Sequence, residues 1–266
     1  MKMKIAVTGS KGKIGQRLVA LGAEPLFCDI TDPFSVEDAI NTVKPDVIIH
    51  AAAVSSIDEC EQDLERAILV NTRGANHVFE AANDIIGEGK VVLLSSEQVF
   101  DGFMGHYKEA DEPLPVNDYG RTKFAAEGLA SLYGDKILRL SRGISASDPD
   151  IEKVVKDVFE NQVPDVPTFI YRSYCHLDFM ARGIWEYANR FEEMPNLLHF
   201  GGSEVLSFYQ LIRMIVGGDV LLKAREHEDR SYTPRSLKCG FDISLWRSYV
   251  LPTFTPFESV ERLLNE

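Results

Sequence analysis

Apolar residues near the start of the chain first form a short continuous run and then recur at helical spacing. The run Ile5–Val7 predicts a buried strand that ends before Gly9, and Ile14, Leu18 and Leu21 then lie along one face of a helix. A strand that turns through glycine into a helix is the first half of a β-α-β unit. Residues 5–21 are therefore predicted to begin such a unit.

The next thirty or so positions repeat this order. A strand is predicted over 26–28, followed by a helix that either Asp32 or Ser35 can cap. The run "DVIIHAAA" (46–53) has the continuous apolar character of a parallel strand covered on both faces. Three strands joined by two helices predict a mononucleotide-binding half of a doubly wound sheet.

Two longer helices and another apolar strand continue the pattern. Small and apolar residues recur along one side of 63–82, and a further helix is predicted over 118–133. Between them the strand 90–96 ends on the hydroxyls of Ser95 and Ser96. Because open parallel sheets bind ligands beyond the carboxyl ends of their strands, both serines are expected at the same sheet edge as the glycine turn.

After residue 142 the pattern is mostly structural. It predicts, in order, a helix over 150–162, a strand at "PTFIY" (167–171), a helix over 176–191, and a strand, turn and helix over 197–218 with Ser207 as cap. We therefore expect an α/β protein with a Rossmann-type doubly wound parallel sheet (1–142) and a small C-terminal substrate-binding lobe (143–266). A segment of about 173–200 is expected to return to the sheet.

The glycine turn indicates a nucleotide site. Gly9, Gly12 and Gly15 have the spacing G-x-x-G-x-x-G, and glycine permits positive φ and a close approach of the backbone to a ligand. The N-terminus of the following helix can hold a pyrophosphate, and small residues after the third strand let a flat cofactor lie against the backbone. The predicted cofactor-binding residues are Gly9, Lys11, Gly12, Lys13, Ile14, Gly15, Asp29, Ala51, Ala52, Ala53, Tyr119 and Lys123.

Charge and composition narrow the partners. A formal net charge of −13 argues against a nucleic acid or an anionic membrane, because both require a basic surface. The four cysteines are scattered, so free thiols and no metal are expected, and His176 and His199 are expected to be structural. No apolar run is long enough for a signal peptide or a membrane span. These features predict a soluble, cytoplasmic protein.

Tyr119 and Lys123 share one face at the start of the helix 118–133, because residues at i and i+4 are neighbours on a helix. Of the nine tyrosines, only Tyr119 has a lysine at this spacing. The ordinary pKa of tyrosine is about 10, and an adjacent cation would lower it toward the working range. The pair could be a solvated helix face, but the glycine turn and Ser96 favour a catalytic pair.

Motifs along the chain resemble the extended short-chain dehydrogenase/reductase family, and within it most closely the dTDP-4-dehydrorhamnose reductases. The matching residues are "TGSKGKIG" (8–15), "DITDP" (29–33), "PDVIIHAAA" (45–53), Asp58 and Glu61 in "IDECE", Asn71, "SSEQVFDG" (95–102) and "YKEADEPLPVNDYGRTKFAAE" (107–127). "RLSRGIS" (139–145) and "LKCGFDISLW" (237–246) match more loosely. The resemblance is dense to about residue 145 and thin after it.

This resemblance implies that NAD or NADP supplies a hydride to the 4-keto group of a nucleotide-linked deoxysugar, as in dTDP-rhamnose biosynthesis. It places the catalytic roles on Ser96, Tyr119 and Lys123. Ser96 would polarise the substrate oxygen and Tyr119 would donate a proton, while Lys123 would also reach the cofactor ribose.

The resemblance also implies contacts outside the catalytic set. Substrate-binding positions are expected at Val54, Phe100 and Arg142. Arg230 and Arg235 lie where the lobe of such enzymes contacts the diphosphate, although solvent exposure is the favoured interpretation of either arginine. A homodimer is expected through the helices 63–82 and 118–133.

Four positions near the catalytic set differ from the family pattern. Ser96 replaces a usual threonine, and Glu97 and Gln98 replace the residues after it. In related 4,6-dehydratases these two positions carry an acid/base pair, and because Gln98 cannot act as a base, dehydration is disfavoured. Arg142 stands where these reductases tend to have a tryptophan near the nucleotide base. An arginine there could bind phosphate, stack on a base or form a surface salt bridge.

The cofactor preference stays open at the sequence level. The second strand is short, so that Asp29 must serve both as the ribose-facing acid and as the first residue of "DITD", or as neither. An acid there favours NAD, whereas Lys11, Lys13 and Arg17 could meet the 2′-phosphate of NADP.

The motifs and their departures from the family pattern leave three candidate functions. The leading one is a sugar-nucleotide 4-ketoreductase. An NDP-sugar epimerase of the same family would retain its cofactor and need no net reductant. A cofactor-binding regulatory subunit, like the methionine adenosyltransferase β subunit, would serve a partner enzyme instead.

Overall fold

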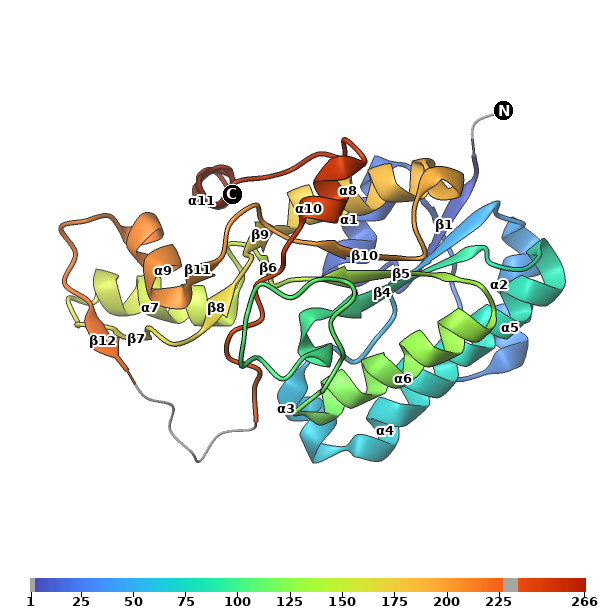
Figure 1. Ribbon diagram of the computed structural model, residues 1–266, viewed down its shortest axis with the longest axis horizontal. Coiled ribbons are helices and arrows are strands. Elements are labelled where there is room, and N and C mark those ends of the chain that lie inside the picture. The colour runs from blue at the N-terminus through green and yellow to red at the C-terminus, as the bar shows by residue number, and fades with distance from the viewer. Residues whose placement is uncertain (1–2, 227–233) are drawn as a thin grey trace.

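The computed structural model describes residues 3–226 and 234–266. Its central sheet contains six parallel strands in the order β10-β5-β4-β3-β1-β2 (Figure 1). The strands are β1 Ile5–Thr8, β2 Glu24–Pro25, β3 Val47–His50, β4 Val91–Ser96, β5 Lys136–Leu140 and β10 Leu197–Phe200. This architecture confirms the predicted α/β class with a Rossmann-type sheet.

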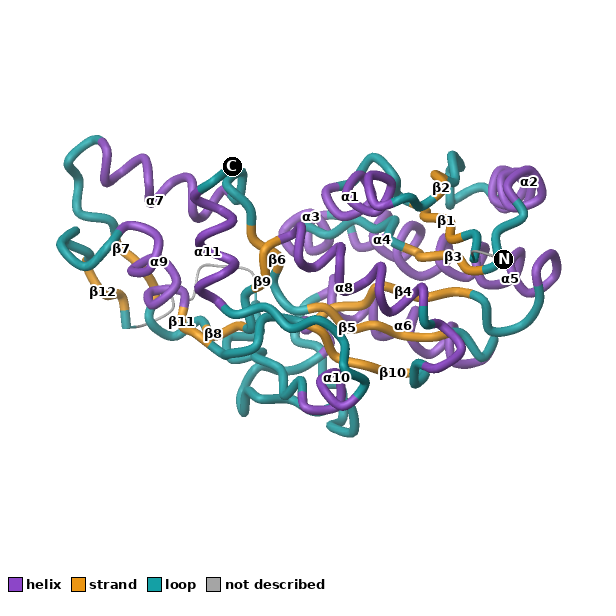
Figure 2. The backbone as a smooth tube through the Cα atoms, turned by 90° about the horizontal axis from the view of Figure 1, so that it is seen from above, coloured by secondary structure: helices purple, strands orange, loops and turns teal. Residues whose placement is uncertain are grey.

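Helices cover both faces of the sheet, as Figures 1 and 2 show. On one face lie α1 (Lys13–Leu21) and α8 (Leu177–Asn189), and on the other α2 (Pro33–Val43), α5 (Ala75–Ile86) and α6 (Asp118–Leu132). Alternate strand residues serve the two layers: Val7 packs with the α1 and α8 layer, and Ala6 packs with the α2 and α5 layer. The central strands β1, β3 and β4 are buried along their whole length because helices cover both faces of the sheet.

The second strand differs from its prediction. Strand β2 pairs Glu24 with Ala6, two residues before the predicted 26–28. The chain then leaves the sheet because Asp29 Oδ1 accepts hydrogen bonds from the Thr31 N–H (2.9 Å) and hydroxyl (2.7 Å), which form a turn into α2. Asp32 caps α2 by accepting from the Phe34 N–H at 3.1 Å, so the choice between Asp32 and Ser35 is settled.

The predicted helix 63–82 is three consecutive segments. After α3 (Ile57–Gln62), α4 (Leu64–Ile68) passes into a π-helical turn, η1 (Leu69–Gly74), which continues as α5 to Ile86. The buried Asn71 lies within the turn and holds the chain after β3: its Oδ1 accepts from the Val54 N–H at 2.8 Å. The wider turn therefore directs a polar side chain into the protein, a common use of π-helical turns.

The lobe has its own small core. It contains α7 (Pro149–Phe159), α9 (Phe208–Val216), α11 (Pro256–Leu264) and three short strand pairs. The pairs are β6 Gly143–Ile144 with β9 Cys175–His176, β8 Tyr171–Arg172 with β11 Leu206–Ser207, and β7 Asp165–Pro167 with β12 Lys223–Arg225. Ser207 caps α9 in a capping box with Gln210, as predicted.

The prediction of a single strand at 167–171 is wrong. Strand β7 ends at Pro167 and β8 begins at Tyr171, because the chain changes partner between them from β12 to β11. Two short ladders therefore replace one continuous strand.

Two stretches of the second half pack on the sheet. The predicted one supplies α8 and β10, linked through η3 (Phe191–Glu193), and α8 packs along α1. The second, around α10 (Ser244–Ser248), places Trp246 flat against Phe200, with ring centroids 4.0 Å apart. The division at residue 142 stays a prediction.

Candidate active site

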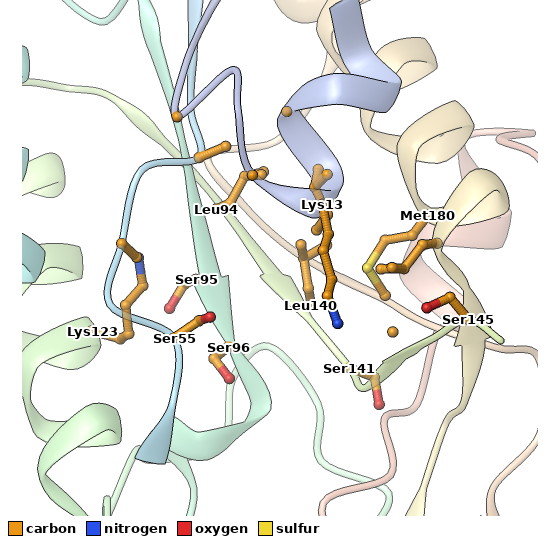
Figure 3. Close-up of a pocket in the computed structure, with 18 of the residues that line it drawn as sticks. Lys13, Ser55, Leu94, Ser95, Ser96, Lys123, Leu140, Ser141, Ser145 and Met180 are labelled. Carbon is orange, nitrogen blue, oxygen red and sulfur yellow. The ribbon is translucent and has the colours of Figure 1, made fainter. Parts of the chain in front are cut away.

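A cavity of about 470 Å³ opens at the carboxyl edge of the sheet, between the glycine turn and the lobe (Figure 3). Strand order reverses between β1 and β3, and such switch points are where open parallel sheets bind ligands. Its lining residues are Gly9, Gly12, Lys13, Ile14, Gly15, Ala51, Ala53, Ser55, Leu94, Ser95, Ser96, Tyr119, Lys123, Leu140, Ser141, Gly143, Ser145, Asp148, Leu177 and Met180. The glycine turn and the predicted catalytic residues therefore share one cavity.

The glycine turn is packed tightly against the residues that follow β3. Gly9 has φ +66°, and a Cβ there would lie 2.7 Å from Ala52 N. A Cβ on Gly15 would lie 2.1 Å from Gly9 O. Gly12 has ordinary extended backbone, with φ −75°, so positive φ is required at Gly9 alone of the three. Side chains at Gly9 or Gly15 would push the turn away from the sheet.

The start of α1 suits an anion. Among the described residues no side chain caps this helix, and its first turn carries no acidic residue. Its N–H groups and helix dipole are therefore available to a phosphate group. Lys13 extends from this end of α1 into the cavity (Figure 3). These features fit the pyrophosphate of a dinucleotide cofactor.

A second hollow, of about 360 Å³, continues past the glycine turn toward α2. It is lined by Gly9, Ser10, Lys11, Leu26, Phe27, Cys28, Asp29 and Ser35. The hydrogen bonds from Thr31 hold the pKa of Asp29 below its usual value, so this carboxylate is ionised at neutral pH. Lys11 and Asp29 lie here rather than in the main cavity, and Ala52 lines neither hollow.

Packing at the start of α6 places Tyr119 beside the end of β4. Asn117 caps the helix, accepting from the Gly120 N–H at 2.8 Å, and its amide donates to Gln98 Oε1 at 3.0 Å. A Cβ on Gly120 would lie 2.1 Å from Gln98 O, so glycine allows the helix to approach this closely. The helix start is thereby fixed to the residues that follow Ser96.

The three predicted catalytic residues lie together at the cavity wall. Ser96 Oγ accepts from the Gln98 N–H at 3.2 Å, which leaves the Ser96 O–H able to donate to a substrate oxygen. Lys123 is buried and faces the cavity from the α6 side (Figure 3). The arrangement has a hydroxyl donor, a phenol and an ammonium group along one wall.

Burial shifts the pKa values of Tyr119 and Lys123 in opposite directions. It raises the pKa of Tyr119 to about 12, and the Ser96 hydroxyl opposes this rise. It lowers the pKa of Lys123 to about 8, opposed by the charge of Glu127. The expectation of a lowered Tyr119 pKa is wrong for this structure, because the cost of burying a charged phenolate exceeds the favourable contacts.

Two of the three predicted substrate contacts are engaged elsewhere. Phe100 is fully buried and stacks on Tyr107, with ring centroids 4.2 Å apart, so it packs in the core and does not line the cavity. Arg142 binds Asp148 at 3.0 Å and Asp150 at 2.8 Å. Of the three roles considered for Arg142, the structure shows the salt bridge. Val54 lies between two lining residues, its backbone held by Asn71.

Other predicted positions are also paired. Arg235 binds Asp58 at 2.8 Å, and Arg230 lies outside the described residues. Glu97 is buried and bonded to Arg172 and Ser141, and burial raises its pKa. It is absent from the cavity lining, so it offers no free acid there.

The two histidines that were expected to be structural lie beside other protein groups. His199 Nδ1 lies 3.1 Å from Tyr107 O, and His176 Nε2 lies 3.0 Å from a Glu266 carboxylate oxygen. His176, Asp178 and Glu266 are close enough to share a cation, but Arg17 and Arg262 already bind Asp178. The four cysteines are free thiols, as predicted.

Most residues on the lobe side of the cavity were not predicted from the sequence pattern. Ser55 follows the predicted Val54, and Leu94 and Leu140 come from β4 and β5. The other unpredicted lining residues follow β5 or lie on α8: Ser141, Gly143, Ser145, Asp148, Leu177 and Met180. Of these, Ser141, Gly143 and Ser145 lie in the loosely matching stretch 139–145. No helix among the described residues is long and apolar enough to cross a membrane.

The comparisons with known proteins agree with this geometry. The family model described as "RmlD substrate binding domain" matches residues 3–227. The chain is 35% identical over 151 residues to a dTDP-4-dehydrorhamnose reductase of Aggregatibacter actinomycetemcomitans, a match that covers 52% of the chain and 51% of the relative. A spore coat polysaccharide biosynthesis protein of Bacillus subtilis is 26% identical and covers 87% of the chain, and 86% of that relative is covered. The chain thus spans about half the length of the first curated relatives it matches.

Solved structures extend the likeness to the whole chain. A dTDP-4-dehydrorhamnose reductase of Bacillus anthracis in complex with NADP has a TM-score of 0.87 at 20% identity and covers 100% of this chain, with 99% of that structure matched. A hypothetical dTDP-4-dehydrorhamnose reductase of Sulfolobus tokodaii has a TM-score of 0.81 at 28% identity, covering 94% of this chain and 96% of its own. The chain therefore belongs to the RmlD substrate binding domain family, within the extended short-chain dehydrogenases/reductases.

Proposed function

We propose that this protein is an NAD(P)-dependent reductase that transfers a hydride to the 4-keto group of a nucleotide-linked deoxysugar. The observation that carries the proposal is the single cavity that joins the glycine turn with Ser96, Tyr119 and Lys123. Curated relatives that match about half of this chain are named dTDP-4-dehydrorhamnose reductases. The bound nicotinamide would supply the hydride.

Side chains and backbone groups of this chain supply the remaining catalytic and cofactor-binding roles. Ser96 donates a hydrogen bond to the keto oxygen and stabilises negative charge as it develops there. Tyr119 gives its proton to that oxygen, and its raised pKa keeps the phenol protonated at neutral pH. Lys123 holds the cofactor ribose, and the start of α1 binds the pyrophosphate.

We also propose a homodimer formed by the outer surfaces of α4, η1 and α6. Leu64, Leu69, Phe124 and Leu132 expose apolar side chains on these elements. Related enzymes pair the corresponding helices into a four-helix bundle. The cytoplasmic location stays a prediction.

The test is a screen of 4-keto-sugar nucleotides with NADH and with NADPH, in which loss of absorbance reports oxidation. One cofactor oxidised per sugar reduced supports the proposal. Product formed without net oxidation identifies an epimerase instead. No turnover on any sugar, with tight cofactor binding, favours the regulatory-subunit alternative, since one relative of that kind is 26% identical over 235 residues.

A further inference from the structure

Behind Lys123 lies a buried polar cluster that the catalytic set does not use. Glu127 follows Lys123 by one helical turn on α6, and both side chains are buried. Glu127 Oε1 accepts hydrogen bonds from Ser95 Oγ and from Arg139 Nε, the latter at 3.0 Å. Its Oε2 accepts from an Arg139 terminal nitrogen at 2.7 Å. Three elements thus meet at one carboxylate.

The partners of Glu127 are themselves fixed. Ser95 and Arg139 lie directly opposite each other on the paired strands β4 and β5. Arg139 also contacts His199 Nε2 at 3.3 Å and lies over the Phe100 ring, 5.0 Å from its centroid. A bidentate pair held in this way has little freedom to move. The Glu127 carboxylate is therefore a fixed negative charge one helical turn from Lys123 on α6.

Other titratable groups around the Tyr119–Lys123 pair come from several elements. They belong to His50 on β3, Cys60 on α3, Glu97 on η2 (Glu97–Val99), and Glu127 with its partner Arg139 on β5. Burial and the nearby Lys123 hold the pKa of His50 at about 3, and burial raises the pKa of Cys60 to about 11, so both are neutral at pH 7. Glu97 is paired with Arg172 and acts on Tyr119, whereas Glu127 acts on Lys123. Glu127 is left as the carboxylate that supports the charge of Lys123.

We propose that Glu127 is a positioning residue for Lys123: its carboxylate, anchored by Arg139 and Ser95, keeps the ammonium group charged and directed into the cavity. The inference rests on the proposed function only in that Lys123 binds the cofactor. Burial already brings the pKa of Lys123 down to about 8, and Glu127 works against that fall. Without Glu127, Arg139 would become a buried cation without its carboxylate, which disfavours a second cation nearby.

The experiment follows NADH binding by fluorescence from pH 6 to pH 10, with no sugar present. Wild-type affinity should fall as the pH rises through about 8, because Lys123 then loses its proton. In Glu127→Gln the midpoint of this fall should move down by about one pH unit or more. Glu127→Asp retains the charge and should restore most of the midpoint.

Glu109→Gln is the matched control, because it makes the same carboxylate-to-amide substitution at the far end of the cluster. There a Glu109 carboxylate oxygen accepts a hydrogen bond from the His199 N–H at 2.9 Å. It should leave the midpoint in place. In a Lys123→Met background, Glu127→Gln should cause no shift, because the titrating group is gone. A shift that persists without Lys123, or a uniform loss of affinity at every pH in Glu127→Gln, would overturn the proposal.

Should Glu127→Gln fail to fold because Arg139 is left unpaired, the comparison moves to an Arg139→Gln background. There the addition of Glu127→Gln should still lower the midpoint, and an unchanged midpoint would contradict the proposal. All of these measurements use cofactor alone. A failed search for the sugar therefore bears on the proposed function, while an unshifted midpoint bears on Glu127.

Discussion

At the scale of single residues, burial determines which form of each site group is present. The same loss of water holds the Tyr119 phenol protonated and lowers the pKa of the Lys123 ammonium to about 8. A proton donor for ketone reduction has to be protonated, so the raised pKa suits Tyr119. Loss of activity above about pH 8 would accordingly report Lys123 and not Tyr119.

Tyr119→Phe removes one hydroxyl and little volume, so the fold and the affinity for NADH should survive. Turnover of the keto-sugar should fall by about 10²–10⁴, the usual contribution of a positioned acid. Lys123→Met should be as damaging and should also weaken NADH binding, because Lys123 has both roles. Ser96→Ala should lower turnover with a smaller effect on the cofactor. Steady-state rates and fluorescence titrations measure the two effects separately, and equal rates for wild type and Tyr119→Phe would contradict the proton-donor role.

Asp135 lies far from this chemistry and carries its own pH dependence. Its Oδ1 accepts from the Val91 N–H at 2.8 Å, its other oxygen is buried without a partner among the described residues, and burial raises the pKa of the carboxyl to about 7. Because an unfolded aspartate ionises near pH 4, the folded state is penalised progressively from about pH 4 to pH 7 and fully above that.

Asp135→Asn should therefore gain stability relative to wild type as the pH rises from 4 to 8, by up to about 4 kcal/mol. Urea unfolding at the two pH values measures this difference, and Asp38→Asn on the exposed side of α2 is the control. A difference that is the same at both pH values would refute the penalty.

At the scale of elements, close approach depends on residues without side chains. The start of α6 reaches η2, directly after β4, only because Gly120 has no Cβ, and α8 reaches β10 because Gly183 has none. A Cβ on Gly183 would lie 2.2 Å from the Phe200 ring. Gly128, on the exposed side of α6, has no such neighbour: nothing lies within 4 Å of its Cβ position.

These two glycines form a matched pair within helices. Gly128 lies one turn from Phe124 on the face of the proposed dimer, so it is tested in a Phe124→Glu background that disrupts this contact. There Gly128→Ala should stabilise the protein by about 1 kcal/mol, because alanine loses less backbone entropy in a helix. Gly183→Ala should destabilise it by about 1–3 kcal/mol, because the methyl group overpacks the contact with Phe200. Thermal or urea unfolding measures both changes, and changes of the same sign would contradict the packing argument.

At the scale of the whole molecule, the sheet edge and the lobe enclose a site that neither contains alone. Ser96 and Lys123 line one side of the cavity, while Ser145 and Met180 line the other (Figure 3). The lobe connects to the sheet through two stretches, which include α8 and α10. The geometry of the cavity therefore depends on contacts between residues widely separated along the chain.

The proposed dimer is a prediction at this scale. Sedimentation at micromolar concentration should show a dimer, and Phe124→Glu should produce a monomer by placing a charge in the α6 contact. Phe159→Glu is the control, because Phe159 is 82% exposed at the end of α7 in the lobe. Wild type that sediments only as a monomer would exclude this association.

The sequence by itself determined the features that depend on local spacing. Apolar runs and helical periods located β1, β3, β4, α1 and α6, since hydrophobic periodicity reflects which faces are buried. The spacing of Gly9, Gly12 and Gly15 located the turn, and the interval from Tyr119 to Lys123 placed both residues on one helix face. The resemblance then supplied Ser96, which shares their cavity.

Only the tertiary structure decided which distant group each polar side chain meets. Arg142 pairs with Asp148, Glu97 with Arg172, and Phe100 lies in the core, none of which local spacing encodes. The same holds for the pKa values of the site, because burial by the surrounding layers raises that of Tyr119 although a lysine lies one turn away. Spacing along the chain sets what is adjacent on one element, whereas desolvation and ion pairing depend on neighbours that folding brings from other elements.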